Sequence, residues 1–307
     1  MKKKENIPLK FNSLSDVHRA FGLPAPLHPL ISLIDNTSNH IEINRPPHSH
    51  VLSFYKMSYK EKLGGKIKYG QGYYDFEDGG LLFASPNQVI GSDTDNLNED
   101  CSLYTLLIHP DFFLSYPLSI KIKQYGFFSY DTKEALHLSE KEKMIILSIF
   151  KIIGEELNNR IDDFSQDVII SQIELLLNYS NRFYKRQFIT RKAINHDLLQ
   201  NFEKILDEYF ASQDSLHQGI PTVQVISKKL NMSSRYLSDM LRSLTGQSTQ
   251  QHIHQKLIEK AKEKLSTTNL SVSEVAYEMG FEHPQSFSKL FKTKTNLSPL
   301  EFRQLFN

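Results

Sequence analysis

The arrangement of apolar and polar residues divides the chain into two parts. Up to about residue 135, short segments rich in aromatic and β-branched residues alternate with turns that contain glycine or proline; clear examples are residues 51–57, 66–69, 80–84 and 102–108. Regularly spaced short strands of this kind are typical of a β-sandwich or a small barrel. From Ser139 onward the apolar residues recur with the period of a helix, so the remaining chain is predicted to be mainly helical.

Two long helices are predicted directly after the strands. The first covers about residues 139–158, and Ser139 with Glu142 forms a capping box at its start. The second covers about residues 165–186 and carries an apolar stripe made of Ile169, Ile173, Leu176 and Leu177. Such a stripe packs on its own domain or pairs with its copy in a homo-oligomer, and the pattern leaves both arrangements open.

The C-terminal segment contains an internal repeat. Residues 223–232 align with residues 272–281, apolar against apolar, and after one inserted residue the correspondence continues as far as Ser248 and Ser298. Between the copies, residues 250–265 are predicted to form one helix that acts as a rigid spacer. If the spacer holds the two copies about 34 Å apart, one turn of B-DNA, a single chain could read two successive major-groove segments.

Each copy has the sequence features of a helix-turn-helix unit. A small residue, Ser227 in the first copy and Ala276 in the second, stands where two helices must approach closely. A residue that tolerates positive φ follows it, Asn231 in the first copy and Gly280 in the second, and allows a tight turn. We therefore predict two helix-turn-helix units.

The second helix of each unit has one apolar face and one polar face. The residues expected to face the core are Leu237, Met240, Leu241 and Leu244 in the first unit and Phe287, Leu290 and Phe291 in the second. The candidate DNA-binding residues are Ser234, Arg235, Ser238, Asp239 and Arg242 in the first unit and Gln285, Ser286, Ser288, Lys289 and Lys292 in the second. Arginine, lysine, glutamine and serine suit the major groove because they donate to guanine, pair with adenine or allow close approach. One copy alone could equally be an ordinary polar face, but two matched copies favour two recognition helices.

Composition and charge add limits to this picture. The 307 residues suit two domains, and the net charge of +1 is uninformative for the whole chain. Between residues 228 and 303, twelve Lys/Arg stand against seven Asp/Glu, which fits DNA binding but on charge alone favours a solvated helix face. There is no apolar run of membrane-span or signal-peptide length, and Cys101 has no second cysteine to pair with. A cytoplasmic protein that does not enter the membrane is therefore expected.

Residues 221–306 resemble the AraC/XylS family of bacterial transcription regulators, most closely over residues 272–303. The resemblance implies a regulator, more often an activator than a repressor, whose partners are promoter or operator duplex DNA, RNA polymerase and a second copy of the chain. It also implies base contacts from Arg235, Ser238 and Arg242 in the first unit and from Gln285, Ser288 and Lys289 in the second, with Lys292 and helix-start amides on phosphates.

Two residues depart from the family's pattern. Asp239 stands where many relatives have a basic or amide side chain, and its carboxylate would repel phosphate although it could accept a hydrogen bond from cytosine. Pro284 stands where a polar residue often faces the groove. We therefore expect the first unit to bind less tightly or to read a different base, and Pro284 to contribute shape.

The resemblance also implies a cupin-like sensor barrel near the N-terminus, with a small-molecule effector. His48 and His50 are similar to the paired histidines of metal-binding cupins, but residues 51–60 lack the acidic ligand that should follow. No metal, cofactor or catalytic residue is therefore expected. The tyrosines and phenylalanines that could line an effector pocket, or simply fill the barrel core, are Tyr69, Tyr73, Tyr74, Phe76 and Phe83.

These interpretations give a multidomain α+β protein. A cupin-like β-barrel is expected over residues 1–138, a helical linker and dimerisation region over 139–195, and an all-α DNA-binding domain with two helix-turn-helix units over 196–307. The protein is not expected to be an enzyme. Two alternatives stay open: a cupin-type metalloenzyme with a helical accessory domain, and an architectural DNA binder without sequence preference.

Overall fold

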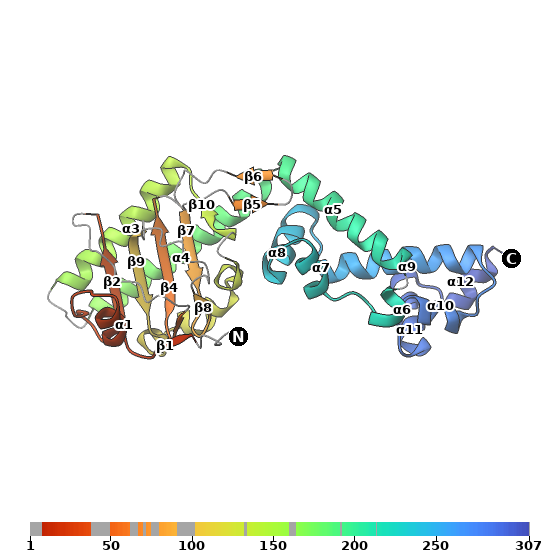
Figure 1. Ribbon diagram of the computed structural model, residues 1–307, viewed down its shortest axis with the longest axis horizontal. Helices are drawn as coiled ribbons and strands as arrows, with labels where there is room; N and C mark the ends of the chain where they lie inside the picture. Colours follow the sequence, from red (N-terminus) through yellow and green to blue (C-terminus); the bar gives the residue numbers. More distant parts are fainter. Residues whose placement is uncertain are drawn as a thin grey trace, which may run out of the picture. The chain divides into compact units, whose positions relative to one another are not determined.

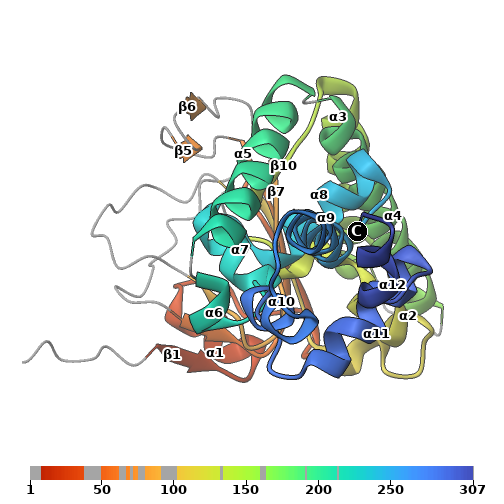
Figure 2. The same cartoon turned by 90° about the vertical axis from the view of Figure 1, so that its right-hand side faces the viewer.

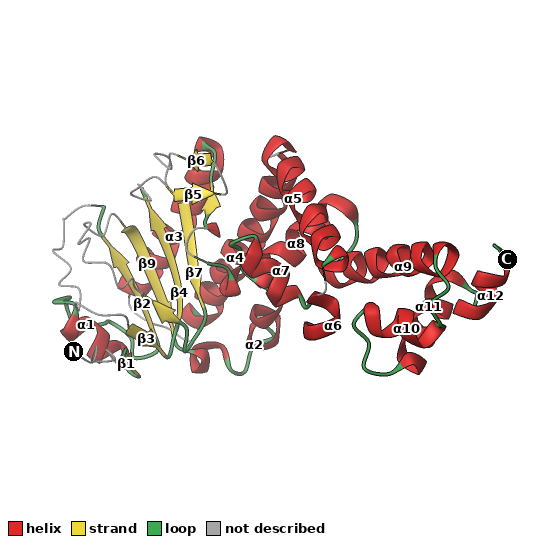
Figure 3. Ribbon diagram, turned by 45° about the vertical axis from the view of Figure 1, so that its right-hand side comes forward, coloured by secondary structure: helices red, strands yellow, loops and turns green. Residues whose placement is uncertain are grey.

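The computed structural model describes residues 8–37, 50–61, 67–69, 72–74, 80–90, 102–131, 134–159, 164–190, 192–212 and 214–306. The chain divides into two compact units, Met1–Gln187 and Phe188–Asn307 (Figure 1). The described strands all lie in the first unit, and the described part of the second unit is helical (Figure 3). No described helix combines the length and the apolar character that crossing a membrane requires.

Among the described residues of the first unit, the largest sheet has five strands. Its order is β10 (Leu136–His137), β7 (Gly80–Ala84), β4 (Tyr55–Lys60), β9 (Ser102–Ile108) and β2 (Ile31–Asp35), with antiparallel neighbours throughout. Met57 of the central strand lies opposite Phe83 on one side and Leu106 on the other, and all three side chains are buried. The apolar segments of the sequence therefore form the middle of this sheet.

Smaller elements surround this sheet. They are a sheet of β1 (Leu9–Phe11), β3 (His50–Leu52) and β8 (Val89–Ile90); a hairpin of β5 (Ile67–Tyr69) and β6 (Gly72–Tyr74); the helices α1 (Leu14–Ala20) and α2 (Leu118–Lys121); and the 3-10 helices η1 (Pro110–Phe113), η2 (Ile122–Gln124) and η3 (Gly126–Ser129). Ser13 is the N-cap of α1, and its side chain accepts a hydrogen bond from the N–H of Asp16.

The cupin-like barrel predicted for residues 1–138 is not confirmed. Within the described ranges, the five-stranded sheet ends at β10 on one edge and at β2 on the other, so its hydrogen-bond ladder does not close on itself. The three-stranded sheet is likewise open, with β1 and β8 at its edges. The strands were predicted correctly as a class, because local alternation reveals strands, but it does not reveal whether a sheet closes.

Two long helices pack against the five-stranded sheet. They are α3 (Glu140–Asn158) and α4 (Ser165–Thr190), and Figure 1 shows both on the same side of the strands. The rings of Tyr104 in β9 and Phe150 in α3 stack with their centroids 5.3 Å apart. The capping box of Ser139 and Glu142 is confirmed. The predicted apolar stripe of α4 is buried within the single chain, so it packs on its own domain and is not exposed for pairing with a second copy.

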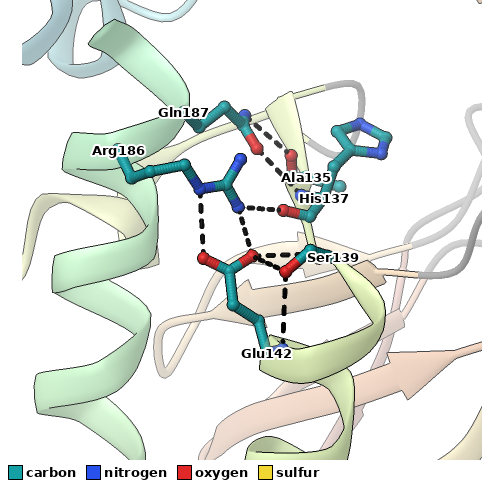
Figure 4. A network of polar contacts seen from close by, with 6 residues as sticks. All are labelled: Ala135, His137, Ser139, Glu142, Arg186 and Gln187. Carbon is teal, nitrogen blue, oxygen red and sulfur yellow. Dashed lines mark hydrogen bonds and ion pairs between the residues drawn. The ribbon is translucent and has the colours of Figure 1, made fainter. Parts of the chain in front are cut away.

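The end of α4 is bound to the edge strand β10 by side chains (Figure 4). The buried amide of Gln187 accepts a hydrogen bond from the N–H of His137 at 2.9 Å and donates one to the carbonyl of Ala135 at 3.3 Å. Arg186 donates to the carbonyl of His137 and pairs with Glu142 of α3, with an Nη2–Oε2 distance of 2.6 Å. The glutamine amide thus hydrogen-bonds the backbone along the outer edge of β10 as a neighbouring strand would.

Replacing Gln187 with alanine is expected to destabilise the first unit by about 1–3 kcal/mol, because the buried N–H of His137 and the carbonyl of Ala135 would lose their partners. Hydrogen exchange measured by mass spectrometry should show faster exchange at the His137 amide. Lys185→Ala, at an exposed position of the same helix, is the control and should leave this exchange unchanged. Equal exchange in the wild type and Gln187→Ala would contradict the role of the amide.

The second unit consists of helices arranged along one long helix. They are α5 (Lys192–Ala211), α6 (Asp214–Gln218), α7 (Val223–Lys229), α8 (Ser234–Thr245), α9 (Thr249–Thr267), α10 (Val272–Glu278), α11 (Pro284–Thr295) and α12 (Pro299–Gln304). Figure 2 views α9 close to end-on, with other helices of this unit around it, and Figure 1 shows α7 and α8 near its first turns and α10 to α12 near its last. The spacer predicted over residues 250–265 is therefore confirmed as a single helix.

Candidate nucleic-acid interface

Both predicted helix-turn-helix units are present, α7 with α8 and α10 with α11. Asn231 has φ +55° and Gly280 has φ +86°, so both turn residues adopt the left-handed conformation that the sequence predicted. Ser227 and Ala276 are buried, and each carbonyl accepts a hydrogen bond from the N–H that follows the turn, at 2.9 and 3.0 Å. The two units therefore close their turns in the same way.

The inward faces of the second helices are also confirmed. Leu237, Met240 and Leu241 of α8 are buried, and Phe287 and Phe291 of α11 are fully buried. The remaining predicted core residues, Leu244 and Leu290, are only partly buried. Because these faces pack inward, the opposite faces of α8 and α11 are directed toward solvent.

Helix α9 joins the two units through its apolar side. Its residues Ile253, Leu257, Ala261 and Leu265 are buried, as predicted from their spacing. The start of the helix is fixed by a capping box in which Ser248 is the N-cap. Helices α5, α8, α10, α11 and α12 all pack on α9. The spacer is therefore part of the core that both units share.

A second connection between the units was not predicted from the sequence. The backbone at Gly219, just before the first unit, lies against the turn of the second unit at Gly280: a Cβ added to Gly280 would be 2.6 Å from the carbonyl carbon of Gly219. Ser215 of α6 donates to the carbonyl of Glu278 at 2.6 Å, and Tyr209 donates to the carbonyl of Gly219 at 2.9 Å. Figures 1 and 2 both show α6 beside α10. The two helix-turn-helix units are thus linked by α9 and by residues 214–219, which comprise α6 and Gly219 and are called the α6 segment below.

The outward face of α8 presents two arginines. Arg235 and Arg242 are exposed, whereas Asp239 is partly buried and pairs with Arg235 at 3.0 Å from Nε to Oδ2. The hydroxyls of Ser234 and Ser238 already share hydrogen bonds inside the unit, with Ser227 at 2.9 Å and with Thr249 at 3.0 Å. The arginines therefore remain the most accessible donors among the candidates of the first unit.

The outward face of α11 is more open. Gln285, Ser286, Lys289 and Lys292 are exposed, and Ser288 is partly buried. Pro284 occupies the first turn of the helix, where its missing N–H costs no hydrogen bond, and the N-cap side chain of His283 makes no capping bond. The candidates predicted for the second unit therefore lie on one accessible helix face.

One exposed lysine of α11 lies outside the predicted face. Lys294 follows the candidates at the end of α11, and its charge helps to lower the pKa of His254 on α9, although burial of the imidazole is the larger cause. Burial likewise lowers the pKa of His252. A lowered pKa favours the neutral imidazole, so these two histidines add little to the positive charge that lysine and arginine give this region. Lys294 was not among the candidates because residues that share a helix face are three or four apart, and Lys294 is five residues from Lys289.

Of the candidates named for the predicted N-terminal barrel, the structure describes the side chains of His50 and Phe83. The ring of His50 packs against Phe11 and Phe21, with centroids 6.3 and 5.5 Å away, while His48 lies outside the described residues. Phe83 is buried against Phe127, with a centroid distance of 4.4 Å, so it fills the core. Phe76 and Cys101, and the side chains of Tyr69, Tyr73 and Tyr74, also lie outside what the structure describes. Because His48 lies outside the described residues, the expectation that the paired histidines hold no metal stays a prediction.

Two helix-turn-helix units on one spacer helix, with apolar faces inside and polar faces outside, define a tandem helix-turn-helix protein. The helix-turn-helix domain family matches residues 226–305, which covers most of both units. The chain therefore carries a helix-turn-helix domain over these residues, which agrees with the resemblance to the AraC/XylS family noted in the sequence.

Three curated relatives show similarity beyond chance. The uncharacterized HTH-type transcriptional regulator YfiF of Bacillus subtilis is 26% identical over 266 residues, which cover 84% of this chain and 79% of the relative. The HTH-type transcriptional activator RhaS of Salmonella schwarzengrund is 26% identical over 161 residues, 52% of this chain and 55% of the relative. Histidine kinase P4 of Formosa agariphila is 23% identical over 143 residues, 46% of this chain and 10% of the relative. The chain thus spans between a tenth and four fifths of these relatives.

Proposed function

We propose that this chain is a sequence-specific DNA-binding transcription regulator. The observation that carries the proposal is the pair of matched outward helix faces, of which Arg235 and Arg242 in α8 and Gln285 and Lys289 in α11 are exposed. These side chains offer the donors and the amide that recognise guanine and adenine in the major groove. The regulators among its relatives support the same reading.

In this proposal α8 and α11 are the recognition helices, and they enter successive major-groove segments of one duplex. Base contacts come from Arg235, Ser238 and Arg242 in the first unit and from Gln285, Ser288 and Lys289 in the second. Lys292 contacts phosphate, and Ser234, Asp239 and Ser286 lie at the edges of the contacts. The spacer α9 and the α6 segment favour a fixed separation between the helices, since both units pack on the same core.

Single substitutions should separate base contacts from phosphate contacts. Arg235→Ala or Gln285→Ala should each cost about 1–3 kcal/mol on the preferred duplex and relax the preference at one base pair. Lys292→Ala should weaken binding to all duplexes alike and lower the salt dependence by about one phosphate contact. Fluorescence anisotropy with a selected duplex and a random duplex, over a series of salt concentrations, measures both effects.

Gln304→Ala, at an exposed position of α12 outside the proposed interface, is the control and should bind like the wild type. Equal losses on selected and random duplexes for all three variants would contradict the division of roles. Binding of the wild type with no sequence preference would instead favour the architectural alternative.

The N-terminal unit, Met1–Gln187, is proposed to sense a signal and to form a homodimer. A small-molecule effector would act by binding two arrangements of the regulator with different affinity. RNA polymerase is the proposed downstream partner, in the cytoplasm, and activation is favoured because RhaS is named a transcriptional activator. Titrating candidate effectors while following promoter binding and transcription with purified polymerase tests these roles; repression of the bound promoter would overturn activation.

A further inference from the structure

The ion pair on α8 joins Arg235 to Asp239 and leaves the outer nitrogens of the Arg235 guanidinium accessible. Arg235 and Asp239 are one helical turn apart, and the bond runs from Nε of the arginine to Oδ2 of the aspartate at 3.0 Å. The arginine side chain is 50% exposed and the aspartate side chain is 22% exposed. Asp239 is thus the more buried partner, and Arg235 extends further into solvent.

This pair adds little to the stability of the helix. An exposed pair at this spacing stabilises a helix only slightly, and the order found here, with the basic residue before the acidic one, is the weaker of the two. On a surface that faces DNA, the carboxylate of Asp239 also repels phosphates. A pair that adds little stability, and whose carboxylate lowers the general affinity for DNA, calls for another explanation.

The geometry of the bond supplies one. A contact through Nε occupies the side of the guanidinium and leaves the Nη1 and Nη2 groups, which have no partner among the described residues, at its far end. Guanine presents O6 and N7 in the major groove as two acceptors that match such a planar fork. Holding the arginine in place before binding also reduces the side-chain entropy lost on the DNA.

We propose that Asp239 is a positioning residue that orients Arg235 toward a guanine in the site read by the first unit. The proposal rests on the proposed DNA-binding function. It also explains an asymmetry between the units: the positions that correspond to Arg235 and Asp239 in α11 are Gln285 and Lys289, which form no such pair in the part of the chain that the structure describes. The first unit then supplies discrimination, and the second unit supplies more of the general attraction to DNA.

Selection of bound duplexes from a randomised library, with the full chain, tests this inference. Arg235→Ala should reduce the preference for guanine at one base pair by about 5- to 150-fold, and Arg235→Lys should lose most of that preference because lysine lacks the fork. Asp239→Ala should reduce the preference at the same base pair by a smaller factor, roughly 3- to 10-fold, while binding to random duplexes becomes tighter. Asp239→Asn should keep much of the preference, since its amide oxygen still accepts from Nε.

The outcomes separate the possible roles of Asp239. The melting temperature of Arg235→Ala should equal that of the wild type, because the pair contributes little stability. If Asp239→Ala relaxes a different base pair from Arg235→Ala, the aspartate reads a cytosine itself and the positioning role is wrong. If the guanine preference is unchanged in Asp239→Ala, the role is also wrong, although the proposed function stands. If the wild type selects no sequence at all, the proposed function fails with it.

Discussion

Replacing Gly280 with alanine is expected to destabilise the second helix-turn-helix unit by about 2–5 kcal/mol. Two causes add. The turn has φ +86°, which strains any residue with a Cβ, and that Cβ would lie 2.6 Å from the carbonyl carbon and 2.9 Å from the carbonyl oxygen of Gly219. Backbone atoms cannot turn aside as a flexible side chain can, so the α6 segment would have to move.

Gly246→Ala is the matched control for this prediction. Gly246 ends α8 with φ +76°, but a Cβ there would meet nothing within 4 Å, so only the conformational strain of about 1–2 kcal/mol remains. Hydrogen exchange of the amides in α10 and α11, together with calorimetric melting, measures the loss at each site. If the two variants were equally destabilised, the contact between the turn and Gly219 would carry no energetic weight.

Phe287→Ala is expected to lower the free energy of unfolding by about 3–5 kcal/mol and to unfold the second helix-turn-helix unit locally. The ring is fully buried and contacts Phe281 and Phe291, with centroids 5.5 and 5.7 Å away, so truncation leaves a cavity in the middle of the core. Because the outward face of α11 depends on this core, sequence preference in the second half of the DNA site should be lost as well.

Two further variants define the control for Phe287. Leu300→Ala removes a large apolar side chain that is 57% exposed and should change stability by less than about 0.5 kcal/mol. Phe287→Leu keeps most of the apolar volume and should fall between the other two variants. Thermal unfolding followed by circular dichroism ranks all three; a loss in Leu300→Ala as large as that in Phe287→Ala would show that burial does not set the cost.

The features that the sequence predicted well are those determined by neighbouring residues. The positive φ of Asn231 and Gly280, the inward faces of α8 and α11 and the capping boxes all follow from spacings of a few residues. The repeat strengthened each of them, since a pattern that occurs twice is tested twice. The outward candidates of the second unit were located for the same reason, because they lie opposite the buried phenylalanines.

Features that depend on distant parts of the chain could not be predicted in this way. Nothing in the local sequence indicates that Ser238 shares its hydroxyl with Thr249, or that Gln187 hydrogen-bonds the backbone of β10 fifty residues earlier in the chain. The closure of the N-terminal sheet is of the same kind, since strand order is set by long-range pairing. The ion pair of Arg235 and Asp239 could have been predicted, because its spacing of four residues is visible in the sequence.

The contact between Gly219 and Gly280 also determines where this domain can be cut. The repeat begins at residue 223, so a fragment starting just before it would contain both units and would look complete. Such a fragment would lack Tyr209 and Ser215, which hold the segment on the second unit, and would uncover the end of α10. The shortest fragment that folds on its own must therefore start before α5. Exchanging the second helix-turn-helix unit with that of a relative requires exchanging the α6 segment that packs on it as well.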